Sequence, residues 1–255
     1  MVANIRKGYE IEGYLLEELV GAGGFSSVYK ARSIYPIPKY DTIIAVKVLH
    51  PRRLERKQIR NFVREAKISM LLTHPNIIKV YQVRKQDRNL FILMEYLDSD
   101  IMKAIKTKSY LFTPSNIIEV IKKAGEGLAY VHDNGIIHKD VNPSNILISY
   151  SLDKIKITDF GLAWRKTFFK RESEIKAGTE GYLAPERLKG CPSDIRTDIY
   201  AFGKTIEKIY TELDFKFSEN LLRTIRKATH PEKEKRFPDM RSLLNSLEEK
   251  TADAY

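Results

Sequence analysis

The alternation of apolar and polar residues changes along the chain, from strand-like to helix-like. Before residue 98, short β-branched or aromatic runs predict strands at 14–20, 29–32, 42–49, 77–83 and 90–96, the last two joined by a polar turn at 84–89. A spacing of three to four residues predicts one helix among them, over 53–72. After residue 97 this helical spacing dominates, over 116–134, 194–210, 219–229 and 239–250. Two short runs, 146–149 and 154–158, predict further strands.

Capping residues mark where two helices begin. Thr113 at the N-cap and Pro114 at the first helical position predict a start, and Gly135 predicts the end of the same helix. This helix leads directly into a polar loop at His138. The run Asp98-Ser99-Asp100 offers further good N-caps, so we expect another helix to begin there.

Composition indicates a globular protein with a basic surface. The 255 residues suffice for a sizeable core, and no apolar run is long enough to span a bilayer. The net charge is +11, from 44 basic and 33 acidic residues. We interpret it as a lysine-rich solvated surface rather than a nucleic-acid site, because no RNA- or DNA-binding signature accompanies it. Contact with an acidic substrate remains open.

Cysteine usage and the first residues bear on the compartment. The lone Cys191 excludes an internal disulfide and a thiolate metal cluster. Residues 1–8 lack the apolar core of a signal peptide. We therefore expect a cytoplasmic protein with no membrane span.

Two neighbouring polar loops carry groups that phosphoryl transfer needs. The stretch His138–Asn145 reads His-Lys-Asp-Val-Asn-Pro-Ser-Asn, and Thr158–Gly161 reads Thr-Asp-Phe-Gly. Phosphoryl transfer requires a carboxylate near the attacking hydroxyl and oxygen ligands for Mg²⁺. Asp140, Asn145 and Asp159 supply such groups. Either loop alone is an ordinary turn sequence, but both in this order form a specific pattern.

A glycine-rich turn between the first two predicted strands suits a phosphate. The stretch Gly21–Val28 lets the backbone approach an anion without Cβ clashes, although a plain glycine hairpin is as common. A dinucleotide fingerprint is disfavoured, because no helix opens at the last glycine. Lys47 follows in an apolar strand, where a charge is costly unless it meets an anion. The alternative is an edge-strand lysine that points to solvent.

Together these motifs resemble the catalytic domain of eukaryotic-type (Hanks-type) serine/threonine protein kinases. The two loops match the family patterns H-R-D-L-x-x-x-N and D-F-G, and Gly178–Glu186 resembles the family's G-T-x-x-Y-x-A-P-E. The likeness runs from about Tyr9 to Glu249.

The resemblance implies an α+β, two-lobed fold in a single kinase domain over residues 1–255. A small lobe at about 9–96 would hold an antiparallel β-sheet and one main helix. A larger, mostly helical lobe would follow at about 97–250. ATP and Mg²⁺ would bind in the cleft.

The same resemblance assigns catalytic roles to five residues. Asp140 would accept the proton of the substrate hydroxyl, and Asn145 and Asp159 would hold Mg²⁺. Lys47 would orient the α- and β-phosphates and pair with Glu65 of the next helix. For Glu65 the alternative is a surface ion pair on its own helix.

A nucleotide site is also implied. The extended segment Met94–Leu97 would offer backbone groups of Glu95 and Leu97 to adenine. Asp100 would reach a ribose hydroxyl, although helix capping explains this residue equally well. The expected nucleotide contacts are Val20, Gly21, Ala22, Gly23, Gly24, Phe25, Val28, Ala45, Lys47, Met94, Glu95, Leu97, Asp100, Leu147 and Asp159.

Two further matches concern the support of the loops. Asp198 matches the family's aspartate that braces the backbone of the catalytic loop. Arg236 matches the arginine that pairs with the glutamate of A-P-E, here Glu186. The alternative is a surface arginine.

The chain departs from the family pattern at several positions. Lys139 replaces the arginine before the catalytic aspartate and lacks the fork that clamps a phosphate bidentately. Asn142 replaces a lysine that neutralises the γ-phosphate, so we expect Asn142→Lys to raise kcat unless another cation compensates. Only residues 211–218 separate two predicted helices, which leaves the family's substrate-docking helix shortened or missing. Ser26 replaces the third glycine of the loop, and Ser69 replaces an apolar helical residue.

We expect phosphorylation of Ser/Thr hydroxyls of proteins, because Thr179 resembles the threonine that contacts the catalytic aspartate in serine/threonine kinases. One alternative is an ATP-binding pseudokinase that serves as an interaction module. Another is a kinase-fold small-molecule phosphotransferase. The five matched catalytic residues argue against the first, and the peptide-binding segment Gly178–Glu186 argues against the second.

The stretch between Asp159 and Glu186 suggests a regulatory switch. Autophosphorylation of Thr167 or Ser173 would add an anion that orders the segment by pairing with cations. The alternative is a basic loop that attracts an acidic substrate and carries no regulatory phosphate. The neighbouring cations are Arg165, Lys166, Lys170 and Arg171.

Overall fold

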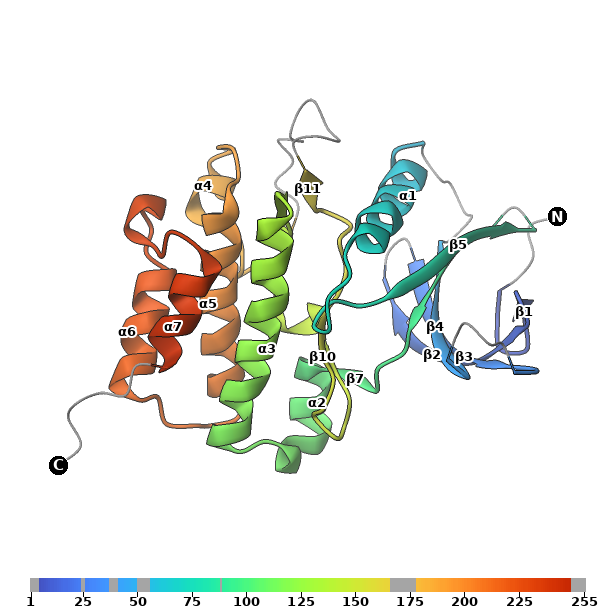
Figure 1. Ribbon diagram of the computed structural model, residues 1–255, viewed down its shortest axis with the longest axis horizontal. Helices are drawn as coiled ribbons and strands as arrows, with labels where there is room; N and C mark the ends of the chain where they lie inside the picture. Colours follow the sequence, from blue (N-terminus) through green and yellow to red (C-terminus); the bar gives the residue numbers. More distant parts are fainter. Residues whose placement is uncertain are drawn as a thin grey trace. The chain divides into compact units, whose positions relative to one another are not determined.

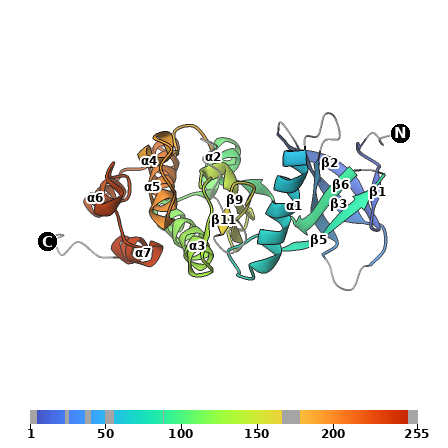
Figure 2. The ribbon, with the colours of Figure 1, turned by 90° about the horizontal axis from the view of Figure 1, so that it is seen from above.

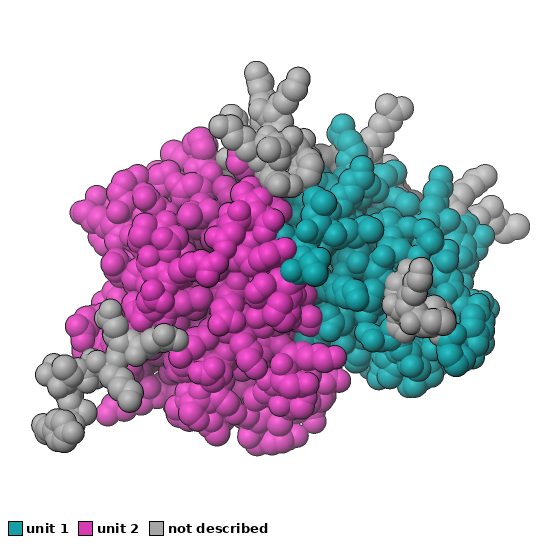
Figure 3. Space-filling view, in the orientation of Figure 1, with its two compact units in different colours: residues 1–73, 78–97 teal, residues 74–77, 98–255 magenta. Residues whose placement is uncertain are grey.

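The computed structural model describes residues 5–23, 26–36, 41–49, 56–87, 89–165 and 178–248. The chain divides into two compact units, which Figure 3 colours separately. Unit 1 comprises residues 1–73 and 78–97, and unit 2 comprises residues 74–77 and 98–255.

Unit 1 consists of a six-stranded sheet and the helix α1 (Arg56–Leu71), as Figure 1 shows. Its strands pair antiparallel in the order β1-β2-β3-β4-β6-β5. The antiparallel sheet with one main helix that the sequence implied is confirmed. The strands are β1 (Glu10–Ile11), β2 (Tyr14–Ala22), β3 (Ser26–Ser33), β4 (Ile43–Leu49), β5 (Val80–Gln86) and β6 (Asn89–Glu95).

The alternation of side chains along β4 gives the sheet two apolar faces. Leu49 packs with Phe62 of α1 on one face. Lys47 lies on the same side of the strand as Leu49, because every second side chain of a strand points the same way. The strand therefore presents its lysine on the face that α1 covers. The β4 residues in the core on the opposite face are Ile44, Val46 and Val48.

Two predicted strand boundaries in unit 1 are wrong. The polar stretch 84–89 is not all turn, because β5 continues to Gln86, which pairs with Asn89 at the start of β6. The polar side chains of this stretch do not show the apolar pattern by which a strand is predicted. The strand forms nevertheless, because the hydrogen bonds between strands use backbone groups, which polar residues also supply. At its other end β5 starts at Val80 rather than Ile77, which forms a parallel bridge with Ile157 in unit 2.

Unit 2 is mainly helical, as the sequence implied. Its two long helices, α3 and α5, contact each other, with α7 packed on α3 and α6 packed on α5 and α7 (Figures 1 and 2). The helices are α2 (Ile101–Lys108), α3 (Pro114–Asp133), α4 (Pro185–Leu188), α5 (Ile195–Glu212), α6 (Glu219–Ala228) and α7 (Met240–Glu248). None of the described helices is both long and apolar enough to cross a membrane.

Short strands of unit 2 form two small sheets, in the orders β10-β9-β7 and β11-β8. They hold the ends of the two loops that carry the chemistry. The strands are β7 (Ser99–Asp100), β8 (Ile136–Ile137), β9 (Ile146–Ile148), β10 (Ile155–Ile157) and β11 (Trp164–Arg165).

The capping signals in the sequence are confirmed. The Thr113 hydroxyl accepts a hydrogen bond from the Asn116 N–H at 3.2 Å, and the Asn116 side chain accepts one from the Thr113 N–H at 2.8 Å. Gly135 follows α3 at φ +68°, a conformation that glycine adopts without a Cβ clash. Asp100 caps α2 by accepting a hydrogen bond from the Lys103 N–H at 2.8 Å.

The connection from α5 to α6 is short and aromatic. Residues 213–218 join the two helices without a helix of their own, so the expected loss of a helix here is confirmed. Phe215 and Phe217 pack against Tyr210, with ring centroids 6.1 and 5.3 Å away. Their packing closes the end of α5, and burial raises the pKa of Tyr210 to about 12.

A buried ion pair ties α4 to the segment before α7. Arg236 donates to both carboxylate oxygens of Glu186 at 2.8 Å, and its side chain is fully buried. Burial raises the pKa of the Glu186 carboxyl, but the hydrogen bonds and charge of Arg236 outweigh this effect and hold the pKa below its usual value. The predicted pair is confirmed, and the alternative of a surface arginine is wrong.

We expect Arg236→Met to lower the free energy of unfolding by about 3–5 kcal/mol, because it leaves a buried carboxylate without its partner. Urea unfolding at neutral pH measures this loss. The matched control, Arg241→Met, removes an exposed ion pair with Asp133 and should cost at most about 1 kcal/mol.

The same pair makes stability depend on pH in a known direction. Because the folded-state pKa of Glu186 is lowered, the contribution of the pair is present above the unfolded-state pKa and is lost as pH falls through the folded-state pKa. The deficit of Arg236→Met should therefore shrink in acid. A deficit that stays constant to the lowest pH at which the protein folds would contradict the ion-pair explanation.

Candidate active site

In unit 2 the structure joins the two loops that the sequence singled out. The Thr158 N–H donates to the Asn145 carbonyl at 3.0 Å, which sets the two loops side by side. The His138 ring packs against Phe160, with centroids 4.8 Å apart, and its Nε2 contacts the Thr158 carbonyl at 3.0 Å. Since a carbonyl only accepts, Nε2 carries the ring proton and Nδ1 is free to accept from the Asp140 N–H at 3.3 Å.

A buried carboxylate on α5 holds the start of the catalytic loop. Asp198 accepts hydrogen bonds from the backbone N–H of His138 at 2.7 Å and of Lys139 at 2.8 Å, and it contacts His132 Nε2 at 2.9 Å. Its complete burial raises the pKa, but the hydrogen bond and charge of His132 and the loop's own donors outweigh burial and lower it. Asp198 is therefore ionised and braces the loop, as expected.

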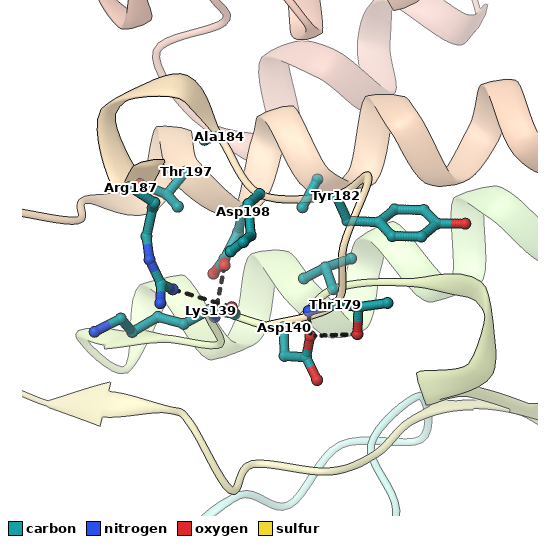
Figure 4. A pocket seen from close by; sticks show the side chains of 11 residues that line it. Lys139, Asp140, Thr179, Tyr182, Ala184, Arg187, Thr197 and Asp198 are labelled. Carbon is teal, nitrogen blue, oxygen red and sulfur yellow. Dashed lines mark hydrogen bonds between the residues drawn. The ribbon is translucent and has the colours of Figure 1, made fainter. Parts of the chain in front are cut away.

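Both polar backbone groups of Lys139 are held by hydrogen bonds (Figure 4). Its N–H donates to Asp198, and its carbonyl accepts from the Arg187 guanidinium at 3.1 Å. Lys139 has φ 71°, a conformation that residues with side chains rarely adopt. These bonds stabilise the strained turn that leads into Asp140. Sequence reasoning missed Arg187, because nothing in the sequence separates it from the many surface cations.

The carboxylate of Asp140 is fixed mainly through one of its oxygens. Oδ1 accepts from both the backbone N–H and the hydroxyl of Thr179, at 2.9 and 2.8 Å (Figure 4). Oδ2 accepts from the Asn145 amide at the longer distance of 3.2 Å, and the same amide donates to the Asp140 carbonyl at 2.8 Å. The structure thus brings together Asp140, Asn145 and Thr179, all three singled out from the sequence.

Asp159 directly follows the residue that joins the loops. It has φ 64°, and its Oδ1 accepts from the Gly161 N–H at 3.2 Å. The turn places a second carboxylate at the junction of the loops. Asn145 complements it: its NH₂ group is committed to Asp140, which turns the amide oxygen away from that residue. Hard cations prefer such oxygen ligands.

A small pocket lies beside the catalytic loop and the segment at 179–184 (Figure 4). Its lining includes Asp140, Thr179, Arg187 and Asp198. Neither Asn145 nor Asp159 lines this pocket, so it is separate from the metal ligands expected from the sequence.

Unit 1 contains Lys47 and Glu65, the remaining two residues that were expected to be catalytic. The Lys47 ammonium lies 2.6 Å from Glu65 of α1, and the two side chains are only 13% and 12% exposed. Because β4 lies between β3 and β6, the alternative of a solvent-pointing lysine on an edge strand is wrong. The alternative of a surface pair within α1 is also wrong for Glu65.

Ser69 bonds to the Glu65 carbonyl at 2.9 Å, which satisfies its hydroxyl within the helix.

The glycine-rich stretch forms a hairpin between β2 and β3. Gly21 and Ala22 pair with Val28 and Ser27, and the Gly23 N–H donates to the Ser26 carbonyl at 2.8 Å. Among the described residues, a Cβ on Gly23 would meet this carbonyl at 3.6 Å, which is an ordinary van der Waals distance. Gly24 and Phe25 lie outside the described residues.

Two of the expected adenine contacts of unit 1 lie opposite each other on paired strands. Ala45 of β4 is in register with Met94 of β6, and both are buried. The Glu95 N–H donates to the Lys79 carbonyl at 2.9 Å, and Leu97 is buried just beyond the strand. Val20 is partly exposed in β2.

Two further expected nucleotide contacts belong to unit 2. Leu147 of β9 is half-buried and pairs with Asp100 of β7. Asp100 uses its Oδ1 for the helix cap, so the capping role is confirmed, while a role toward ribose stays a prediction. The proposed phosphorylation sites Thr167 and Ser173, with Lys166, Lys170 and Arg171, lie outside the described residues, as does the side chain of Arg165.

Comparison with known proteins agrees with this geometry. The protein kinase domain model matches residues 14–251. The chain is 32% identical over 208 residues to the serine/threonine-protein kinase PrkC of Bacillus subtilis, which covers 80% of this chain and 31% of that protein. It is 34% identical over 205 residues to the serine/threonine-protein kinase PknB of Mycobacterium leprae, which covers 78% of this chain and 32% of that protein.

The chain thus spans about a third of the length of these two relatives. The matched range includes the Lys47–Glu65 pair, both polar loops and the Glu186–Arg236 pair. On this match, and with an antiparallel sheet followed by a helical unit, the chain belongs to the protein kinase family.

Proposed function

We propose that this chain is an ATP-dependent protein kinase that transfers the γ-phosphoryl group of ATP to serine and threonine hydroxyls. The observation that carries the proposal is the asymmetry of Asp140. Within the part of the chain that the structure describes, Thr179 holds Oδ1 through two donors, whereas Oδ2 receives one longer contact, from Asn145. A base needs a fixed carboxylate with one oxygen available to the substrate hydroxyl. The names of both relatives support serine and threonine as acceptors.

Asn145 and Asp159 would hold Mg²⁺, whose charge neutralises the phosphates. Their donor set fits a hard cation, because it offers an amide oxygen and a carboxylate. The described residues contain no group of three or more His, Cys, Asp or Glu side chains that could hold a metal ion by itself. The two ligands Asn145 and Asp159 suit Mg²⁺, which usually takes one or two protein ligands and completes its shell with substrate phosphates and water.

Lys47 would orient the α- and β-phosphates. Its ion pair with Glu65 keeps the ammonium in one place, so that it need not be ordered when ATP binds. The backbone of the hairpin at Gly21–Val28 would approach the phosphates, and the paired Ala45 and Met94 would border adenine with Val20, Val28, Leu97 and Leu147. Glu95 and Leu97 would offer backbone groups, and Asp100 the ribose contact.

Two further parts of the proposal concern the surroundings of the reaction. The excess of 44 basic over 33 acidic residues favours an acidic protein substrate. A single, exposed Cys191 favours the reducing cytoplasm as the working compartment.

We expect Asp140→Asn to lower kcat by about 10²- to 10⁴-fold, because an amide cannot accept the proton of the hydroxyl. The affinity for ATP should change little. Transfer of labelled phosphate to a generic protein substrate measures kcat, and Asp153→Asn in the exposed turn between β9 and β10 is the matched control. Wild-type turnover by Asp140→Asn would remove the assignment, and label found only on small metabolites would favour a small-molecule phosphotransferase.

Glu65→Gln should lower kcat/KM for ATP by roughly tenfold, because the change replaces a charge-assisted hydrogen bond to Lys47 by a neutral one. Steady-state kinetics with ATP as the varied substrate give this value. Glu17→Gln, which weakens an exposed pair with Arg32, is the control and should leave the kinetics unchanged. An unchanged kcat/KM for Glu65→Gln would show that Lys47 needs no partner to orient ATP.

We propose that the chain autophosphorylates at Thr167 or Ser173. The double variant Thr167→Ala, Ser173→Ala should lose both the phosphate and part of the activity, because a phosphate there would pair with nearby cations and order the segment. Mass spectrometry after incubation with ATP finds the sites, and the kinase assay measures the effect. Full activity, with no phosphate in residues 164–176, would leave only the attraction of acidic substrates for this basic stretch.

A further inference from the structure

Asn142 uses its whole side chain for bonds within the protein. It is buried, with 3% of its surface exposed. Its Nδ2 donates to the Asp140 carbonyl at 3.1 Å and to the Thr179 hydroxyl at 3.0 Å. Its Oδ1 accepts from the Ser144 N–H at 2.9 Å. Since an amide NH₂ has two hydrogens, both donors are committed, and the residue has none left for a phosphate.

The bond to Thr179 fixes the direction of a hydrogen-bond chain. A hydroxyl has one hydrogen, and the donor Asn142 can only be met by an oxygen lone pair of Thr179. The Thr179 hydrogen is then directed to Asp140 Oδ1, 2.8 Å away. The chain runs from Asn142 through Thr179 to Asp140, and it keeps Oδ1 saturated so that Oδ2 is the oxygen left for a substrate.

The other end of Asn142 organises the next turn. Asn142 is the N-cap of a short 3₁₀ helix, Pro143–Asn145, through its bond to Ser144. Its own carbonyl accepts from the Asn145 N–H at 3.0 Å. One side chain therefore links the carboxylate of Asp140 with the turn that presents Asn145.

We propose that Asn142 is a positioning residue that sets the orientation of the Asp140 carboxylate through Thr179 and, by capping the following turn, the place of Asn145. This inference rests on the proposed function of Asp140 as the base. It changes the expectation from the sequence that a lysine at position 142 would raise kcat. Lysine has donors but no acceptor, so it would release the Ser144 N–H and loosen the turn.

The sharpest test is Asn142→Asp, which has nearly the same shape. The carboxylate still accepts from Ser144, but it replaces the shared donor by an acceptor, so the Thr179 hydroxyl can turn away from Asp140. We expect kcat to fall by about 10- to 100-fold, as for other small displacements of a reacting group. The KM for ATP and the thermal midpoint should stay close to those of the wild type.

A second readout separates positioning from mere support. A displaced reacting carboxylate lowers kcat while the KM for ATP and the thermal midpoint stay close to those of the wild type. Asn142→Lys should also lower kcat. A purely structural defect would lower the thermal midpoint together with kcat.

Thr179 provides an independent arm, because it lies on an exposed segment where substitution need not disturb folding. Thr179→Val removes the hydroxyl and should lower kcat as Asn142→Asp does, whereas Thr179→Ser keeps it and should retain activity. Combining Asn142→Ala with Thr179→Val should cost no more than the worse single change, because both break one chain. Thr211→Val, which removes a distant hydroxyl bonded to the Glu207 carbonyl, is the control.

The outcomes distinguish this inference from the proposed function. Wild-type kcat in Asn142→Asp or Thr179→Val, with Asp140→Asn inactive, would overturn the positioning role and leave the base in place. Losses that multiply in the double variant would also overturn it. If Asn142→Asp does not fold, the comparison of Thr179→Val with Thr179→Ser decides the matter. Turnover by Asp140→Asn would instead remove the proposed function.

Discussion

The site in unit 2 depends on one buried negative charge, that of Asp198. A carboxylate without access to water is costly unless its oxygens are filled by donors, and here two backbone N–H groups of the catalytic loop and His132 supply them. The requirement works in both directions: the loop satisfies the charge, and the charge holds Lys139 in a conformation that its side chain disfavours. Asp140 is the next residue, so the position of its backbone is fixed as well.

Two ion pairs elsewhere in the protein also satisfy charges that are shielded from water, one of them buried and the other mostly buried. Arg236 meets Glu186 in a buried bidentate pair, and Lys47 meets Glu65 in a pair that is mostly shielded from water. Each pair joins segments far apart in the sequence, because geometry that satisfies a buried charge is found only where two elements meet. Each of these two pairs holds together elements of its own unit, while exposed ion pairs such as Arg241–Asp133 contribute little.

Hydrogen bonds attach the segment at 178–187 to the catalytic loop. Thr179 binds Asp140 twice and Asn142 once, and Arg187 binds the Lys139 carbonyl. The amide of Asn142 is committed to these bonds and to Ser144, so it offers neither charge nor a free donor to a phosphate. Hydrogen bonds of this kind are short-ranged, so the arrangement of Asp140 depends on where this segment lies.

The sequence by itself predicted the long helices, most strands of unit 1, the helix caps and the residues expected to carry the chemistry, because periodicity, capping and loop motifs are local properties. It did not predict the short elements β1, β8, β11 and α4. Asp140, Asn145, Asp159, Lys47 and Glu65 were all named from such patterns. Only the tertiary structure decided which partners these groups meet: that Lys47 faces α1, that Arg187 holds the loop, and that Asn142 is saturated by protein atoms. The physical reason is that a hydrogen bond between distant residues depends on packing, which no local pattern in the sequence encodes.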